Sequence, residues 1–160
     1  MNELVTIAEK IAAQLIARKQ TIAVAESSTG GLISAALLSV PGASAYFLGG
    51  AVVYTRDARR RLMDIPDEAM KGIRSASEPY AKLLADQARQ RFSTNWGLSE
   101  TGATGPTGNR YGDAAGHSCM AVAGPQNDVF TLETGSGDRQ ANMQAFAKTA
   151  LNLLLETLSK

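Results

Sequence analysis

Apolar residues recur along this chain with two different periods. A spacing of three and four residues predicts amphipathic helices, of which the clearest cover residues 3–19, 78–92 and 139–158. Short apolar runs rich in β-branched side chains predict strands over residues 21–25, 45–54, 96–101, 119–123 and 129–133. Further helices are predicted over about residues 29–39, over residues 56–63 and from Pro66 onward. The chain therefore alternates helices with strands.

This order of elements predicts the fold class. Helices that alternate with short buried strands favour an α/β domain, here a three-layer α/β/α sandwich around a mixed, mostly parallel sheet. The last two predicted strands meet at Gly124-Pro125 and form an antiparallel hairpin. No internal repeat, low-complexity segment or linker divides the 160 residues. We therefore expect a single domain over residues 1–160.

Small and polar residues fill the turn between the first strand and the second helix, where residues 25–31 read AESSTGG. Such a turn lies at the carboxyl end of a strand, where open α/β sheets bind ligands, and the following helix presents unpaired N–H groups. Ser27, Ser28 and Thr29 can cap the helix or face a ligand, and Gly30 and Gly31 allow close backbone approach. Two interpretations stay open: a seat for an anion or a developing oxyanion, or a well-capped helix start.

Glycines also interrupt two later segments. Gly49-Gly50 lies in the middle of a predicted strand, which indicates a bulge or a close approach to the backbone. Residues 102–116 are too rich in Gly and Pro for regular structure, and loops of this length in compact domains are usually functional or disordered.

Composition and charge exclude several classes of function. Sixteen basic and fifteen acidic residues leave a net charge of +1, so we expect neither nucleic acid nor a membrane as a partner. One cysteine, Cys119, and one histidine, His117, exclude an internal disulfide and disfavour a zinc site, and we expect no metal or cofactor. The amino-terminal residues lack the features of a signal peptide, so we expect a cytoplasmic protein. A homo-oligomer is compatible with the sequence.

The polar residues of the predicted loops supply hydroxyls and cations but few carboxylates. The candidates are Ser27, Ser28, Thr29, Ser44, Tyr54, Arg59, Arg60, Arg61, Thr101 and Arg139. This set suits attack on a carbonyl by a serine, or capture of a phosphate-bearing small molecule, better than chemistry with paired carboxylates. A Ser-His-Asp triad would need His117, which no serine motif accompanies, and we expect a solvent-side histidine there.

Four blocks of this sequence resemble one known family. Residues 25–31 resemble the AESCTGG signature of the C-terminal domain of the competence/damage-inducible protein CinA. PGASAYFLGG over residues 41–50, followed by Val53-Tyr54-Thr55, is similar to the family block PGSSAYFxGGxVxYS. TGATGP over residues 101–106 resembles the TGIAGP loop, and Gly137-Asp138-Arg139 resembles the GDR motif. The blocks occur in the family order and cover nearly the whole chain.

The resemblance implies a nicotinamide-nucleotide amidase, which hydrolyses the carboxamide of nicotinamide mononucleotide to the carboxylate and ammonia. It places Ser27 and Ser44 on the functional serines of the family, either of which could be the nucleophile. Tyr54, Thr101 and Arg139 fall on a site tyrosine, a site hydroxyl and a site arginine. The substrate-binding positions that it implies are Thr29, Gly30, Gly31, Gly49, Gly50, Gly102, Gly105 and Arg139.

Position 59 departs from the family pattern. YSNEAK of the family aligns with residues 54–59, so Arg59 stands where the lysine base of a serine–lysine mechanism is expected. A guanidinium stays protonated near neutral pH and does not accept a proton there. We therefore expect Arg59, together with Arg139, to hold the phosphate or the carboxamide oxygen. Milder departures are Ser28 for cysteine, Cys119 for an aromatic residue, and a loop that lacks the family's GG and KPVG pattern. The alternative to an amidase is therefore a diverged, non-catalytic paralogue that binds a nucleotide or a partner protein.

Overall fold

A computed structural model describes all residues from Met1 to Lys160. Its α-helices are α1 (Asn2–Arg18), α2 (Leu32–Leu38), α3 (Arg56–Met63), α4 (Glu78–Phe92) and α5 (Arg139–Leu158). Its strands are β1 (Ile22–Glu26), β2 (Phe47–Val52), β3 (Trp96–Ala103), β4 (His117–Ala123) and β5 (Asp128–Glu133). Two short 3₁₀ turns, η1 (Ala43–Ala45) and η2 (Asp67–Met70), complete the order. The sequence therefore predicted every strand and α-helix, whereas the helix expected from Pro66 onward is only the turn η2.

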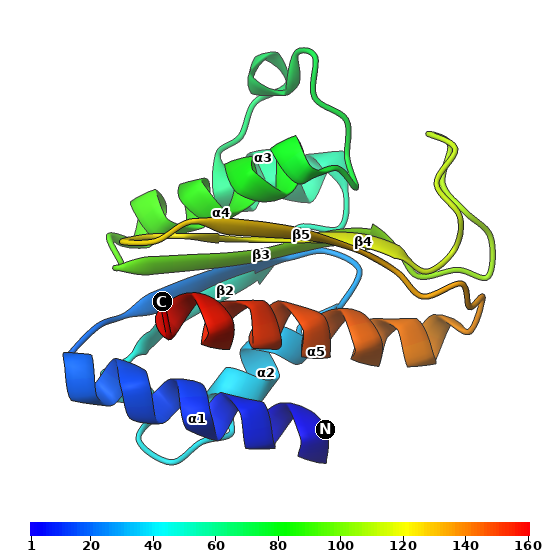
Figure 1. Ribbon diagram of the computed structural model, residues 1–160. Coiled ribbons are helices and arrows are strands. Elements are labelled where there is room, and N and C mark those ends of the chain that lie inside the picture. Colours follow the sequence, from blue (N-terminus) through cyan, green and yellow to red (C-terminus); the bar gives the residue numbers. More distant parts are fainter.

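The five strands form one mixed sheet in the order β2-β1-β3-β4-β5. β1 pairs in parallel with β2 and β3, and β4 pairs antiparallel with both β3 and β5. Four of the five strands thus run in one direction. α1, α2 and α5 cover one face of the sheet, and α3 and α4 cover the other (Figure 1). The predicted three-layer α/β/α fold is confirmed.

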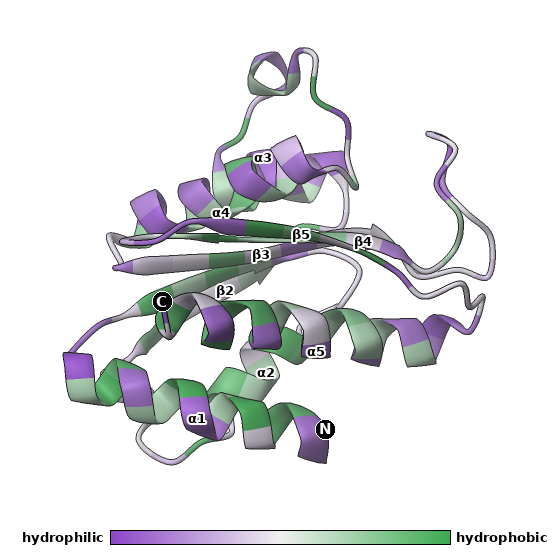
Figure 2. Cartoon of the chain, viewed as in Figure 1, coloured by the Kyte–Doolittle hydropathy of each residue, from purple (hydrophilic) through white to green (hydrophobic).

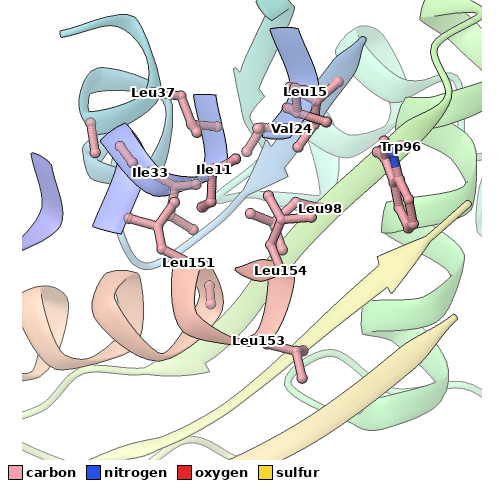
Figure 3. Packing of buried hydrophobic residues seen from close by; sticks show 14 of the residues in the cluster. Ile11, Leu15, Val24, Ile33, Leu37, Trp96, Leu98, Leu151, Leu153 and Leu154 are labelled. Atoms are coloured by element: carbon pink, nitrogen blue, oxygen red, sulfur yellow. The ribbon is translucent and has the colours of Figure 1, made fainter. Parts of the chain in front are cut away.

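The larger hydrophobic core lies between the sheet and the layer of α1, α2 and α5. It contains 22 buried residues, among them Ile11 and Leu15 of α1, Leu98 of β3 and Leu151 of α5, which point toward one another in Figure 3. All five residues of β1 are buried because helices cover both faces of this central strand. The helices carry polar residues beside apolar ones, as amphipathic elements do (Figure 2).

The paired glycines of β2 mark a bulge and two close contacts. Ile22 pairs with Phe47 and Ala23 pairs with Gly49, so Leu48 is the extra residue. A Cβ atom on Gly49 would lie 2.5 Å from the Phe92 ring of α4, and one on Gly50 would lie 2.4 Å from Ser34 Oγ of α2. The predicted bulge and close approach are confirmed, but the approaching groups are side chains of this chain.

None of the helices is both long enough and apolar enough to cross a lipid bilayer.

Candidate functional site

A cavity of about 670 Å³ opens beside the carboxyl ends of β1, β2 and β3, where the sequence predicts the ligand. Five of the predicted site residues line it, namely Ser27, Tyr54, Arg59, Thr101 and Gly102. The remaining wall comes from the start of α3, from residues 73–76 before α4, from Tyr80 of α4 and from the loop at residues 109–111. The cavity therefore joins segments that are distant in the sequence.

Ser27 follows the last residue of β1 and borders this cavity. Its backbone N–H donates to Glu100 Oε1 at 3.2 Å, which fixes the turn. Its hydroxyl makes no hydrogen bond within the protein, and neither does the backbone N–H of Ser28, whereas every other N–H from residue 27 to residue 31 has an acceptor. The turn thus presents the free Ser27 hydroxyl to the cavity, and the unbonded N–H of Ser28 lies next to it in the chain.

The predicted anion seat at the start of α2 is occupied by the protein itself. Glu26 accepts hydrogen bonds from the backbone N–H groups of Gly31, Ile33 and Ser34 at 2.9–3.1 Å. These groups are the orphan donors of a helix N-terminus, and the Glu26 carboxylate satisfies them. The interpretation of a well-capped helix start is therefore the right one for α2, and an external anion has no free donor there.

Glu100 of β3 holds the serine turn from the other side. Its carboxyl accepts from the N–H groups of Ser27 and Thr29 and from the hydroxyls of Ser28 at 2.5 Å and Ser118 at 3.0 Å. Glu100 is fully buried. Burial raises the pKa of Glu100, and the hydrogen bonds from these partners offset only part of that rise. Glu26 and Glu100 were not among the predicted site residues, although each is a charged residue in a predicted buried strand or at its end.

Three predicted binding residues of the turn do not reach the cavity. Thr29 is fully buried, and its hydroxyl lies 2.7 Å from Glu26 Oε1 and 3.0 Å from Glu100 Oε1. Gly30 and Gly31 have φ values of +64° and +106°, which supply the left-handed backbone that turns β1 into α2. Their role in this structure is to shape and cap the turn, because none of the three lines the cavity.

Ser44 and the glycines of β2 also lie away from Ser27. Ser44 is exposed in η1, before the first residue of β2, whereas the cavity lies beyond the last residue of that strand. Six strand residues span about 20 Å, so Ser27 and Ser44 of one chain cannot act on the same reacting bond. Gly49 and Gly50 do not line the cavity, and the groups near their Cα atoms are the side chains of Phe92 and Ser34.

Tyr54 and Arg139 meet at the rim. Arg139 Nη2 donates to the Tyr54 hydroxyl at 3.3 Å, and Nη1 donates to the carbonyl of Gly105 at 2.5 Å. Arg139 thereby ties the glycine-rich loop to the end of β2. The resemblance implied that Gly105 and Arg139 bind substrate, but the structure brings them together with each other and places neither among the residues that line the cavity.

Arg59 is buried in the cavity wall, with its charge neutralised. Its Nε donates to the carbonyl of Ile65 at 3.1 Å and its Nη2 is paired with the carboxylate of Asp67. Desolvation acts to raise the pKa of Asp67, but the hydrogen bond from Arg59 and the charge of Arg60 outweigh it, so this pKa lies below its ordinary value. The position of the expected lysine base is therefore filled by a fixed ion pair.

Thr101 connects the cavity to a buried histidine. Its Oγ1 accepts the N–H of Ala76 at 3.1 Å, which leaves its own proton free for another acceptor. The carbonyl of Ala76 accepts from His117 Nε2 at 2.7 Å, and Nδ1 of His117 contacts the carboxylate of Glu133. His117 is buried, so the expectation of a solvent-side histidine was wrong. The reason is that β4 begins at His117, where antiparallel pairing with Ala103 draws it under the segment before α4.

Further residues that line the cavity were not predicted as site residues, although Arg56 falls within the segment that aligns with YSNEAK. They include Arg56, Arg74, Tyr80, Arg110 and Tyr111. Burial raises the pKa of Tyr80 to about 12, so its hydroxyl stays protonated. No group of three or more His, Cys, Asp or Glu side chains is arranged to hold a metal ion.

Comparison with known proteins identifies relatives of the whole chain. The sequence model of the CinA C-terminal domain matches residues 4–158. The chain is 38% identical over 146 residues to a CinA-like protein from Anaeromyxobacter sp. (strain K), a match covering 91% of this chain and 36% of that protein. It is 35% identical over 151 residues to a CinA-like protein from Chlorobium limicola, covering 91% of this chain and 35% of that protein. The chain thus spans about a third of the length of these curated relatives.

Solved structures match over nearly their full length. The competence/damage inducible protein CihA from Agrobacterium tumefaciens superposes with a TM-score of 0.90 at 28% identity, covering 99% of this chain and 96% of that one. A CinA superfamily protein from Enterobacter cloacae superposes with a TM-score of 0.89 at 26% identity, covering 97% and 92%. Because the family match extends over almost every residue, the chain belongs to the CinA C-terminal domain family.

Proposed function

We propose that this chain binds nicotinamide mononucleotide in the cavity beside Ser27 and hydrolyses its carboxamide to the carboxylate and ammonia. The observation that carries the proposal is the free hydroxyl of Ser27, held at the carboxyl end of β1 by Glu100 and open to the cavity. Membership of the CinA family and the motif resemblance support the choice of substrate. The volume of about 670 Å³ lies within the usual range for pockets that bind small molecules.

The proposed reaction assigns one role to each of four groups in or next to the cavity wall. Ser27 Oγ attacks the carboxamide carbon and forms a C–O bond, the C–N bond breaks, and the proton that the Ser27 hydroxyl gives up ends on the nitrogen, which leaves as ammonia. Water then hydrolyses the ester and regenerates Ser27. The N–H of Ser28 and the hydroxyl of Thr101 are donors for the developing oxyanion. The Tyr54 hydroxyl, which Arg139 holds at the rim, orients the substrate.

A second candidate function rests on the ion pair at position 59. Asp67 is the one carboxylate that lines the cavity, and no lysine or histidine lines it. Asp67 contacts both Arg59 and Arg60, and its lowered pKa makes it a weak proton acceptor. A serine without a neighbouring base is a poor nucleophile. The alternative is therefore a nucleotide-binding protein that keeps the cavity and has lost the reaction.

Ammonia release from nicotinamide mononucleotide tests both functions. We expect turnover by the wild-type chain and loss of at least about 100-fold in Ser27→Ala, because a single serine supplies the attacking atom. Ser159→Ala, an exposed serine outside the cavity, is the matched control. Turnover that survives in Ser27→Ala but disappears in Ser44→Ala would contradict the role of Ser27.

Arg59→Lys separates an enzyme from a diverged copy. If the wild type shows no turnover and Arg59→Lys does, the missing base is the sole defect of the wild-type site. If neither protein shows turnover and the nucleotide raises the Tm of the wild type, the binding function is favoured. If the nucleotide neither stabilises the chain nor is hydrolysed, both proposed functions fail.

A further inference from the structure

The arginines of the cavity fall into two groups. Arg59 is paired with Asp67, and Arg74 makes a two-pronged contact with Asp113 at 2.7 and 3.1 Å. Arg56 and Arg110 have no carboxylate within ion-pair distance, although both line the same cavity. The net positive charge of the cavity therefore resides mainly on these two side chains.

Tyr111 holds one of the unpaired arginines in the cavity wall. Arg110 Nη2 donates to the Tyr111 hydroxyl at 3.1 Å, and the Arg110 guanidinium lies 5.2 Å from the centre of the Tyr111 ring. The Arg74 guanidinium lies 5.3 Å from the centre of the same ring. The hydrogen bond from Arg110 lowers the pKa of Tyr111, and the positive charges of Arg110 and Arg56 lower it further. Arg56, Arg110 and Tyr111 thus line one cavity, with Arg110 fixed against the phenol oxygen.

We propose that Arg56, Arg110 and the Tyr111 hydroxyl form a binding subsite for a phosphate monoester, at the part of the cavity formed by α3 and the loop at residues 109–111. The inference rests on the proposed function, in which this group is the 5′-phosphate of the nucleotide. It differs from what the sequence suggested, because Arg59 and Arg139 are already bound to protein oxygens. No motif of the family resemblance includes Arg110 or Tyr111.

The chemistry of the subsite selects this ligand class. A phosphate monoester carries about −1.5 to −2 charges near neutral pH and three acceptor oxygens. Two guanidinium groups match that charge, and each can donate two parallel N–H hydrogen bonds to phosphate oxygens. A single carboxylate ligand carries one charge and would need only one guanidinium. α3 begins at Arg56, so the positive end of its dipole lies at the same wall. An uncharged nucleoside would leave both arginines without a partner.

Calorimetric titration of nicotinamide mononucleotide and nicotinamide riboside tests the subsite. In Arg56→Met and in Arg110→Met we expect the Kd for the nucleotide to rise about five- to tenfold each, the range for a charge-assisted hydrogen bond at a partly exposed site. The Kd for the riboside should change less than about twofold, since it lacks the phosphate. Arg61→Met is the matched control, because Arg61 lies on the same helix, is paired with Asp57 and does not line the cavity.

Two phosphate probes separate this proposal from the proposed function. Ribose 5-phosphate should bind the wild type and lose affinity in both variants, even if the carboxamide is never hydrolysed. Inorganic phosphate is the second probe. A general anion site binds inorganic phosphate and ribose 5-phosphate equally, whereas a site that recognises the sugar ester binds ribose 5-phosphate more tightly. Equal losses for nucleotide and riboside, unchanged affinity for the nucleotide, or no binding of any phosphate probe would overturn the subsite.

Discussion

At the scale of single residues, one hydroxyl in the buried turn has two carboxyl neighbours. Thr29 Oγ1 carries one hydrogen, yet it lies within hydrogen-bond distance of both Glu26 and Glu100. It can donate to only one of them, so the other contact requires a proton on a carboxyl group. Burial raises the pKa of Glu100, so the buried site favours the neutral form of this carboxyl group.

Replacing Glu100 by the neutral amide of glutamine, which has the same shape, should be tolerated because burial favours the neutral form. In Glu100→Gln the amide oxygen can accept from Ser27 and Thr29, and the amide nitrogen can donate to the hydroxyl oxygens of Ser28 and Ser118. Glu100→Ala leaves those partners unpaired and should lower the free energy of unfolding by about 3 kcal/mol. Denaturant unfolding followed by Trp96 fluorescence measures the free energy of unfolding of Glu100→Gln and Glu100→Ala. Glu9→Gln, on the surface of α1, is the control.

The pH dependence gives the same substitution a sharper test. A raised folded pKa means that Glu100 contributes stability at low pH, and that this contribution is lost as pH rises from the unfolded value through the folded value. Glu100→Gln does not titrate, so its stability relative to wild type should increase as pH rises above the ordinary glutamate pKa of about 4.3. A pH-independent loss equal to that of Glu100→Ala would mean that the carboxylate is ionised in the folded chain.

At the scale of elements, His117 joins three segments that border the cavity. It connects β4 to β5 through Glu133 and to the segment before α4 through the carbonyl of Ala76, with Asp113 of the glycine-rich loop 3.6 Å away. Burial acts to lower the pKa of His117, but Glu133, the Ala76 carbonyl and Asp113 outweigh it, and the net pKa is raised. Both ring nitrogens face acceptors, which favours the imidazolium.

His117→Gln should therefore be most destabilising in acid. The stabilisation by a raised folded pKa is fully present below the unfolded pKa of about 6.5 and is lost as pH rises through the folded value. We expect the Tm difference between wild type and His117→Gln to be larger at pH 6 than at pH 9. A difference that is constant across this range would show that packing, and not charge, explains the role of His117.

The contact between α4 and β3 depends on a glycine. A Cβ atom on Gly97 would lie 2.0 Å from the backbone oxygen of Ala85, which cannot rotate away as a side chain can. Gly97→Ala should lower the free energy of unfolding by about 3 kcal/mol because α4 must move away from the sheet. Gly137→Ala is the control, since the nearest atom to its Cβ would be at 3.4 Å, and thermal unfolding should detect less than about 0.5 kcal/mol. Equal effects of the two substitutions would contradict this account.

At the scale of the whole molecule, the cores on the two faces share one sheet. The large cluster packs α1, α2 and α5 on one face, and two smaller clusters pack beneath α3 and α4 on the other. β1 contributes to clusters on both sides, with Val24 in one and Ala23 in the other, and β4 does the same with Met120 and Cys119. We therefore expect the layers to unfold together.

One unfolding transition should report both layers. Trp96 is 1% exposed, so its fluorescence follows the core, while far-ultraviolet circular dichroism follows all helices. The two midpoints should coincide in denaturant, and Leu151→Ala should shift both by the equivalent of about 3 kcal/mol. Leu38→Ala, 55% exposed on α2, should shift neither by more than about 0.5 kcal/mol. Separate midpoints for the two signals would show that the layers unfold independently.

The elements were predictable to within a few residues, but the site was predictable only in part. Periodicity predicted α1, α4 and α5 because the apolar face of a helix is recorded in local spacing. Ser27, Tyr54 and Thr101 reached the cavity because they follow or end strands that share one edge of the sheet. Ser44 did not, since a short turn before β2 places it at the opposite edge.

The sequence by itself determined the three layers, the family and the turn at Ser27. These features depend on the order of apolar and polar residues within short segments, where each residue's neighbours are its neighbours in the chain. Only the tertiary structure decided which charges meet. Glu26 occupies the anion seat of α2, Glu100 reaches the serine turn from 73 residues away, and Asp67 neutralises Arg59 while Arg56 and Arg110 stay unpaired. Ionic contacts of this kind depend on distances that exist only after the strands have paired and the loops at their ends have come together.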